Sequence, residues 1–408
     1  MAGILEGLRL VECAAFIAAP LGGMTLAQLG ADVIRCDPPG GGLDHNRWPV
    51  TRAGRSLYWA GLNKGKRSIA VDTTKPRGRE IVTALATAPG PNAGLFTTNF
   101  PARGWLAYDT LRKQRADLIM VNITGNPDGS SAVDYTVNCA AGFPMATGPA
   151  DHDGVVNHLL PAWDAITGVT AAVGLLAAER HRSRTGAGQL IKLPLSDVAF
   201  AMVGTLGHIA EAQVNGEVRS RHGNALYGAF GRDFVTRDGQ RIMLIAITPK
   251  QWQSLIEATG LAADIVAVET RRGLDFMREG DRFTARDALF PLFERWIGAH
   301  DLGDVAVAFD RLAVCWGRYR DFGDLVANDP RCSPANPMFR FVEQPGIGRY
   351  LMPGSPLDFS GVERLPAAPA PLLGQHTDEV LFGVLGLSSR QIGELHDQKI
   401  VAGAEEVR

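Results

Sequence analysis

The sequence has few cysteines, and they are not spaced to form a disulfide framework or a zinc site. Its 408 residues include five cysteines, with no Cys-x-x-Cys pair and no close cluster. An odd, dispersed set in a long chain is typical of proteins in a reducing compartment, so we expect a cytoplasmic protein. The nine histidines contain no His-x-x-x-His or His-x-His pair, and we therefore predict no metal site.

Long apolar runs are also missing. The longest, Val169–Ala178, ends at the charged stretch Glu179–Arg182 and is too short to cross a bilayer. The N-terminal segment carries Glu6, Arg9 and Glu12 where a signal peptide would need an apolar core. We therefore expect neither a transmembrane helix nor a signal peptide.

The chain has no excess of charge of either sign. Lysine and arginine total 41 and aspartate and glutamate 43, which gives a net charge of -2. This balance gives no reason to expect nucleic acid or an anionic membrane as a partner. With 46% hydrophobic residues, the chain is long enough to bury a large core and to form two domains.

Two signatures of common α/β enzymes are absent. A nicotinamide-binding fold needs glycines at the turn between the first strand and the first helix, but Glu12–Pro20 contains none. Gly22 and Gly23 come too late to serve this purpose. No Gly-x-Ser-x-Gly sequence is present, so a nucleophile elbow of the α/β-hydrolase type is also excluded.

The first half of the chain alternates between strand and helix patterns. Such alternation predicts an α/β fold with a buried, mostly parallel sheet and a Rossmann-like large domain. Strands are predicted at Leu8–Val11, Ala31–Cys36, Ser68–Val71, Ala93–Thr97, Leu118–Ile123 and Gln189–Leu193. Helices are predicted at Leu21–Leu29, Arg77–Thr87, Asp109–Arg115, from Asp164 onward, and at Ser196–Ala212.

The pattern changes after residue 218. Arg219–Gly231 is rich in glycine and polar residues and is predicted to be a linker. Phe234–Ile247 is typical of a hairpin with Asp238-Gly239 at its turn. We therefore predict a large domain over 1–218, a small inserted α+β domain over 225–328, and a return to the large domain over 335–408. Further helices are predicted at Gln251–Thr259, Ala285–His300 and Ser389–Asp397, the last after a Pro/Gly-rich region over Asn328–Gly361.

One aspartate, Asp164, heads a segment made mostly of small and apolar residues. It has two interpretations. Asp164 could cap the helix that follows by accepting hydrogen bonds from the free N–H groups of its first turn, which is the commoner use of such a residue. It could instead be a catalytic carboxylate, with the small residues leaving room for a ligand.

Several remote stretches resemble family III CoA-transferases, in the family's order and over nearly the whole chain. The stretches are Gly7–Glu12, Ala18–Pro20, Leu29–Arg35, Asn63–Asp72, Thr98–Phe100, Ala178–Gln189 and Pro371–Leu381. The resemblance implies an acyl-CoA substrate, no cofactor beyond its CoA moiety, and an interlocked homodimer.

The resemblance also implies a role for Asp164, which matches the family's catalytic aspartate. A carboxylate suits CoA transfer because it forms a mixed anhydride that the CoA thiolate can reopen at either carbonyl, whereas a serine would trap the acyl group as a more stable ester. Asp164 must be ionised to attack, and we expect the positive end of the helix dipole to favour that form. Asp164 could then act as both nucleophile and cap.

The same resemblance implies a set of CoA contacts. Arg103 aligns with the family's phosphate-contacting arginine. The other aligned positions are Ile17 and Ala18 beside the nucleophile, Val71 to Thr74 on the adenine side, and Asn99 and Phe100. Two interpretations stay open for neighbouring cations. Lys75 could supply charge to CoA or be solvated before a helix, and the basic group Lys64, Lys66 and Arg67 could face phosphate or form an exposed turn.

Related racemases pair the aspartate with a histidine, but Val133 stands where that histidine would be, which favours transfer. The most detailed resemblance is to members that move CoA between the C1 and C4 carboxyls of mesaconyl-CoA. The stretches that carry it are Ala18–Gly30, Asn99–Trp105, Val156–His158, Leu160–Asp164 and Tyr227–Asp233. His158 and Arg232 could then contact the free carboxylate, or be a loop histidine and a surface arginine. Transfer to a separate acid, racemisation, and CoA binding without catalysis remain alternatives.

Overall fold

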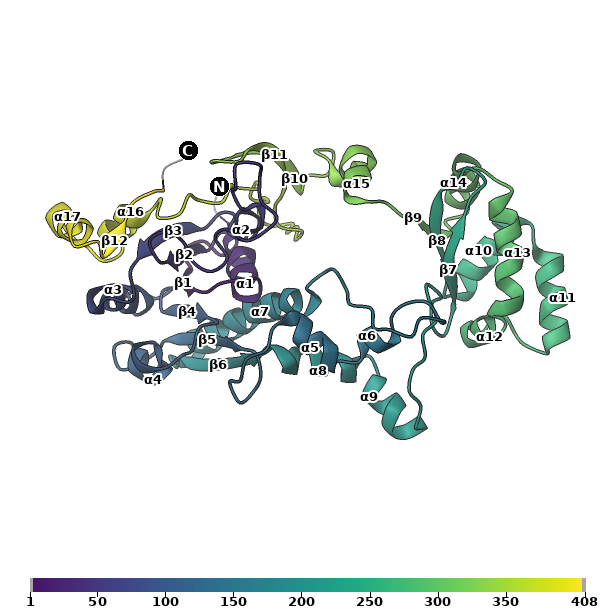
Figure 1. Ribbon diagram of the computed structural model, residues 1–408, viewed down its shortest axis with the longest axis horizontal. Coiled ribbons are helices and arrows are strands. Elements are labelled where there is room, and N and C mark those ends of the chain that lie inside the picture. Colours follow the sequence, from purple (N-terminus) through teal and green to yellow (C-terminus); the bar gives the residue numbers. More distant parts are fainter. Residues whose placement is uncertain (1–2, 406–408) are drawn as a thin grey trace. The chain divides into compact units, whose positions relative to one another are not determined.

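The computed structural model describes residues 3–405 and divides into two compact units (Figure 1). The large unit comprises the chain up to Ala141, His158–Asn215, and the chain from Pro330. The small unit comprises Gly142–Asn157 and Gly216–Asp329. No helix in the described part of the chain combines the length and the apolar character needed to cross a membrane.

The large unit is built on a seven-stranded sheet with strand order β12-β3-β2-β1-β4-β5-β6. All neighbouring strands run parallel except β12, which pairs antiparallel with β3. The order 3-2-1-4-5-6 is that of a doubly wound α/β fold, so the predicted mostly parallel sheet is confirmed. The strands are β1 Arg9–Cys13, β2 Asp32–Asp37, β3 Arg67–Val71, β4 Leu95–Thr98, β5 Ile119–Thr124, β6 Gln189–Pro194 and β12 Val401–Ala402.

The strands form where they do because they are nearly continuous apolar runs with both faces covered, as a parallel sheet requires. On one face a core is made with α3, α16 and α17, through residues such as Ile81, Val380 and Leu395. On the other face α1 and α7 contribute Leu26, Ala171 and other small apolar residues. These helices are α1 Ala18–Ala27, α3 Pro76–Ala86, α7 Ala162–Thr185, α16 Thr377–Gly383 and α17 Ser389–Asp397.

Helices α1 and α7 cross at very short range. A Cβ added to Gly168 would lie 2.7 Å from the backbone oxygen of Ala18, and one added to Gly22 would lie 2.9 Å from that of Gly168. Only glycine allows backbones to approach this closely. The crossing therefore holds the start of α1 against Gly168. On α7, Gly168 lies about one turn after Asp164.

Shorter elements complete the large unit. They are α2 Leu57–Leu62, a 3-10 turn Gly104–Leu106, α4 Tyr108–Arg112, α5 Asp134–Ala140, α8 Leu195–Thr205, α9 His208–Ala210, a π-helical turn Glu211–Asn215, a 3-10 turn Pro330–Cys332, and the hairpin β10 Phe339–Gln344 with β11 Gly348–Pro353. The hairpin lies inside the Pro/Gly-rich region Asn328–Gly361, for which no strand was predicted. The C-terminal segment was expected to end in a helix, but it continues into β12 at the edge of the sheet.

The small unit has a three-stranded antiparallel sheet, order β7-β8-β9, and its own apolar core around Phe230, Trp252 and Phe293. The predicted hairpin with Asp238-Gly239 at its turn is confirmed as β7 and β8. Its elements are α6 Phe143–Ala146, β7 Phe230–Val235, β8 Arg241–Ala246, α10 Pro249–Thr259, α11 Ala262–Arg272, α12 Glu279–Thr284, α13 Arg286–Gly298, α14 Leu302–Arg311, β9 Cys315–Arg318 and α15 Phe322–Asn328.

Two details of the small unit differ from the sequence-based expectations. The end of the predicted linker Arg219–Gly231 belongs to β7, because Phe230 is fully buried in the core. Residues 142–157, predicted within the large domain, belong to the small unit. The guanidinium group of Arg221 joins these segments by donating hydrogen bonds to the backbone oxygens of Met145, His152 and Gly154.

Candidate active site

Asp164 lies in the first turn of α7, but another residue caps that helix. The Oδ2 atom of Asp134, at the start of α5, accepts hydrogen bonds from the backbone N–H groups of Trp163 (2.8 Å) and Asp164 (3.0 Å). Asp134 is almost fully buried. The prediction that Asp164 could itself be the cap is therefore wrong. Its carboxylate accepts no hydrogen bond from the part of the chain that the structure describes, and it is available for chemistry.

The electrostatic environment of Asp164 also differs from the expectation. Burial, followed by the negative charge of Asp134, raises the pKa of Asp164 to about 6, and the positive charge of Arg47 partly offsets this rise. We expected the helix N-terminus to favour the ionised form. The free N–H groups of the first turn point to Asp134 instead, so their effect on Asp164 is outweighed.

His158 is held by the same capping carboxylate. Its Nε2 atom lies 3.0 Å from Oδ1 of Asp134, and its ring packs edge-on to Tyr135 with the ring centroids 6.1 Å apart. The sequence could not decide between a substrate contact and a loop histidine. The structure gives His158 a protein partner and links it to Asp164 through Asp134.

The loop after β1 is fixed in an unusual conformation beside the start of α1. The Asn99 side chain makes two hydrogen bonds to the backbone of Ala15. Its Oδ1 accepts from the Ala15 N–H (3.0 Å), and its Nδ2 donates to the Ala15 oxygen (2.8 Å). Phe16 has a φ of 69°, a strained value for a bulky residue. Its N–H donates to Oδ2 of Asp44 at 2.9 Å. Ile17 and Ala18 follow at the start of α1, close to Asp164.

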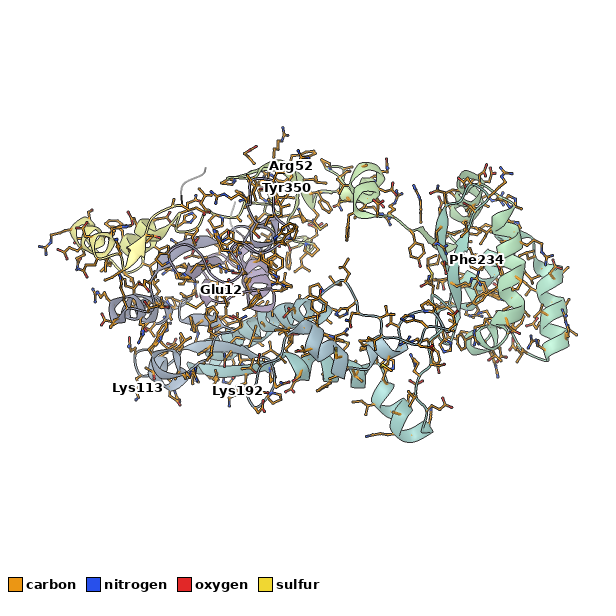
Figure 2. The ribbon with its side chains drawn as sticks, in the orientation of Figure 1. Glu12, Arg52, Lys113, Lys192, Phe234 and Tyr350 are labelled. Atoms are coloured by element: carbon orange, nitrogen blue, oxygen red, sulfur yellow. The ribbon has the colours of Figure 1, made fainter. Side chains whose placement is uncertain are left out.

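A buried ionic cluster lies beneath this loop and explains how it is held. Arg35 pairs with Asp37 at 2.8 Å and with Asp44 at 2.9 Å, and Lys66 pairs with Glu12 at 2.8 Å. Figure 2 labels Glu12 in the interior of the large unit. A buried carboxylate is tolerated only when it is paired, so Arg35 fixes Asp44, and Asp44 in turn fixes Phe16.

The basic group Lys64, Lys66 and Arg67 fits neither of its predicted interpretations. Lys66 is fully buried against Glu12, and Lys64 is buried with its Nζ donating to the Pro353 oxygen at 3.0 Å. The Arg67 guanidinium group is only partly exposed and pairs with two carboxylates of the large unit. These cations stabilise the large unit, and they form neither an exposed turn nor a free phosphate site.

The residues that resemble CoA contacts gather at the carboxyl ends of β1, β3 and β4, the edge where ligands bind in open α/β sheets. They differ in how free their side chains are. Val71 is fully buried, Thr74 bonds to Asp72, and Lys75 Nζ donates to the backbone oxygens of Gln398 and Lys399, both at 2.8 Å. These side chains are engaged within the protein.

Arg103 and Phe100 are more accessible. Phe100 is 38% exposed, and Arg103 is exposed at the start of the 3-10 turn after β4. Within residues 3–405, the Arg103 guanidinium group has no hydrogen-bond or ion-pair partner. A guanidinium group whose N–H donors are not engaged by a carboxylate is suited to binding a phosphate.

Arg232 belongs to the small unit and is not a plain surface arginine. Its guanidinium carbon lies 4.9 Å from the Phe234 ring centroid and 5.1 Å from that of Phe290, and its Nη2 lies 3.3 Å from Glu294. It lines an open cavity of about 550 Å³ within the small unit.

Sequence reasoning missed two residues near Asp164. The guanidinium carbon of Arg47 lies 5.5 Å from the ring centroid of Phe16 and 5.4 Å from that of Tyr58. Both Arg47 and Tyr58 interact electrostatically with Asp164. Arg47 lies in a loop without a recognisable motif, so no sequence pattern could have identified it.

The geometry can support nucleophilic attack by a carboxylate. Among the described residues, no group of three or more histidine, cysteine, aspartate or glutamate side chains is arranged to hold a metal ion.

Comparison with known proteins places this geometry in context. The model of CoA-transferase family III matches residues 5–377. The chain is 60% identical over 406 residues to 2-methylfumaryl-CoA isomerase of Chloroflexus aurantiacus, covering 99% of both chains. It is 28% identical over 399 residues to succinyl-CoA:mesaconate CoA-transferase of Haloarcula hispanica, covering 93% of this chain and 96% of the other. A CAIB/BAIF family protein from Brucella suis has the same fold, with a TM-score of 0.77, 24% identity, and coverage of 94% of this chain and 100% of the other.

Proposed function

Since this chain belongs to CoA-transferase family III, we propose that it is a 2-methylfumaryl-CoA isomerase, which moves CoA from the C1 to the C4 carboxyl of mesaconyl-CoA. The observation that carries the proposal is the 60% identity, over 99% of both chains, to the Chloroflexus aurantiacus protein of that name. The relatives that transfer CoA between separate molecules are much more distant, at 28% identity or below.

The proposed reaction uses Asp164 as the nucleophile. Its carboxylate attacks the C1 thioester carbonyl, the CoA thiolate leaves, and a mixed anhydride forms. The thiolate then attacks the Asp164 carbonyl of this anhydride, which gives an aspartyl-CoA thioester and releases mesaconate as a dianion. The C4 carboxylate attacks this thioester and expels the thiolate again. Attack of the thiolate on the C4 carbonyl completes the transfer and frees Asp164.

The environment of Asp164 suits this role. A pKa of about 6 leaves the carboxylate largely ionised at neutral pH, and the shortage of hydrogen bonds to it leaves its electron pairs available for attack. Asp134 fixes the backbone of the turn that carries it. Such preorganisation matters because small displacements of a nucleophile cost large factors in rate.

We further propose that CoA binds along the carboxyl ends of β1, β3 and β4. Arg103 would bind phosphate and Phe100 would lie beside it, while Ile17, Ala18 and Asn99 would line the thioester end. Val71, Thr74 and Lys75 would contribute through their backbone, since their side chains are buried or engaged. The family resemblance also leads us to propose an interlocked homodimer.

Two other functions are alternatives. An α-methylacyl-CoA racemase needs a second base at the α-carbon, and Val133 at the racemase position cannot move a proton. An intermolecular CoA-transferase would use the same nucleophile with a separate acid as acceptor.

The experiment is to supply mesaconyl-C1-CoA alone, in ²H₂O, and to follow the products by mass spectrometry and chromatography. The isomerase forms the C4-CoA ester without an added acid and takes up no deuterium. A requirement for an added acid would support the intermolecular transferase. In a parallel incubation with a saturated 2-methylacyl-CoA, deuterium uptake at its α-carbon would support the racemase.

A further inference from the structure

We propose that Arg47, assisted by Tyr58, binds the carboxylate of the substrate that is not attached to CoA. The pair would thus determine specificity for a diacid. This inference rests on the proposed function, which requires an acyl group with a second carboxylate.

The position of Arg47 follows from the way the loop after β1 is held. Its guanidinium group lies against the ring of Phe16, and Phe16 directly precedes Ile17 and the start of α1. The close crossing of α1 and α7 brings Ala18 within one helical turn of Asp164. Arg47 therefore lies beside the loop that leads into α1, and its charge acts on Asp164.

Arg47 differs from four neighbouring cations in having no carboxylate partner. Arg35, Lys66 and Arg67 each pair with an aspartate or glutamate, and Arg55 pairs with Glu405. Within residues 3–405, no carboxylate lies within ion-pair distance of the Arg47 guanidinium group. A guanidinium group without a carboxylate partner can bind a substrate carboxylate with two parallel hydrogen bonds.

Tyr58 supplies a second donor to the same place. Its hydroxyl group is buried and makes no hydrogen bond within the described part of the chain. Buried hydroxyl groups are nearly always satisfied, so this one calls for a partner. Burial raises the pKa of Tyr58 to about 12, and the hydroxyl group therefore remains a hydrogen-bond donor at working pH.

This arrangement fits a reaction in which one diacid presents its two ends in turn. While C1 reacts at Asp164, the C4 carboxylate would pair with Arg47. After CoA has moved to Asp164, the diacid would turn, and the C1 carboxylate would take the place at Arg47. A monoacyl-CoA of the same shape has no carboxylate for Arg47 to bind and would lose this charge-assisted pair.

The test compares two CoA esters that differ at one end. Tiglyl-CoA has a methyl group where mesaconyl-C1-CoA has its free carboxylate. Hydroxylamine traps the acylated Asp164, and mass spectrometry measures how fast each ester forms that adduct. We expect Arg47→Gln to slow the reaction of mesaconyl-C1-CoA on the order of 10²-fold and to leave that of tiglyl-CoA within a few-fold of wild type.

Two further variants separate the contributions. Tyr58→Phe keeps the ring against Arg47 and removes only the hydroxyl group, so the loss should be about 10-fold and again limited to mesaconyl-C1-CoA. Arg47→Lys keeps the charge but not the fork, and should recover part of the rate. Arg52→Gln is the matched control, because Arg52 is exposed in the same loop, as Figure 2 shows, and should behave like wild type.

Equal slowing of both esters by Arg47→Gln would overturn the proposal and make Arg47 a residue that tunes Asp164 or supports the loop. A matching fall in melting temperature would identify a loss of fold. Failure of the proposed function is distinguishable, because wild-type protein would then make no C4-CoA ester from mesaconyl-C1-CoA alone.

Discussion

At the scale of single residues, Asp164 is a carboxylate that the fold keeps at a cost. Burial and the charge of Asp134 raise its pKa to about 6, whereas an ordinary aspartic acid has a pKa of 3.8. The unfolded chain therefore ionises Asp164 more readily than the folded protein does, and ionisation opposes folding. The difference corresponds to at most about 3 kcal/mol, and to less than this because the side chain is partly exposed.

Replacement of Asp164 by asparagine should accordingly separate stability from activity. Because Asp164→Asn removes the charge, it should stabilise the protein above pH 6 by about 1–3 kcal/mol. The gain should shrink as the pH falls from 6 and vanish only well below 3.8, where Asp164 is protonated in both the folded and the unfolded wild type. Urea unfolding at several pH values measures this, and turnover should fall by on the order of 10⁴ or more. If the gain in unfolding free energy over wild type is no larger at pH 8 than at pH 4, the environment assigned to Asp164 is wrong.

Arg103 supports a second prediction at this scale. Its exposed guanidinium group has no partner in the described chain, and the proposal places a CoA phosphate on it. Arg103→Ala should raise the Kd of CoA esters by on the order of 10-fold or more and leave that of free mesaconate unchanged, because only the ester carries phosphates. Calorimetry with each ligand measures this, and Arg112→Ala, another basic residue of this region, is the control. Equal weakening of both ligands would remove Arg103 from the phosphate site.

At the scale of elements, the start of α7 depends on a residue from α5. Asp134 accepts from two N–H groups of α7, and its charge raises the pKa of Asp164. Asp134→Asn keeps an oxygen for the cap and removes the charge, so the pKa of Asp164 should fall. The rise in the rate of Asp164 acylation with pH should then shift to lower pH.

Asp134→Ala removes the cap as well and should cost about 1–2 kcal/mol of stability beyond the asparagine variant. Pre-steady-state acylation across pH 4.5–8, together with denaturant unfolding, separates the two effects. An unchanged pH profile for Asp134→Asn would show that Asp134 does not set the ionisation of Asp164.

The elements also show which features a sequence can reveal. Buried strands such as Leu95–Thr98 and helices such as Ser389–Asp397 were predicted because their own residues carry the pattern. Strand β12 was missed because Val401–Ala402 is too short to have a pattern, and it forms only by pairing with β3. The capping of Trp163 by Asp134 was missed for a related reason, since the two residues lie far apart in the sequence and meet only in the fold.

The residues of the candidate site also divide into those that the sequence identifies and those that only the fold brings together. Asp164 was identified through the family resemblance, which carries information about chemistry that periodicity lacks. Lys64, Lys66 and Arg67 were misjudged because a basic stretch looks the same whether its charges face solvent or are paired inside. Arg47 was overlooked because its importance comes from the neighbours that it meets in the fold, Phe16 and Tyr58.

At the scale of the whole molecule, the large unit holds every residue proposed to act in the chemistry or to bind CoA. It is assembled from three stretches of chain, and the small unit from two. Asp164, the residue that caps its helix and the loop after β1 come from separate parts of the sequence, joined by the α1–α7 crossing and the buried ionic cluster. For the whole molecule we therefore propose that both carboxyls of one diacid react at Asp164 before the diacid leaves the site.

That claim is tested most directly by a crossover measurement. Mesaconyl-C1-CoA is converted in the presence of excess ¹³C-labelled free mesaconate, and mass spectrometry follows the label in the C4-CoA product. A diacid held in the site reacts before it can exchange, since a pre-positioned group has a large advantage over one arriving from solution. We predict a C4-CoA product essentially free of label. Label entering the product at the rate of turnover would contradict it and identify an ordinary two-substrate CoA-transferase.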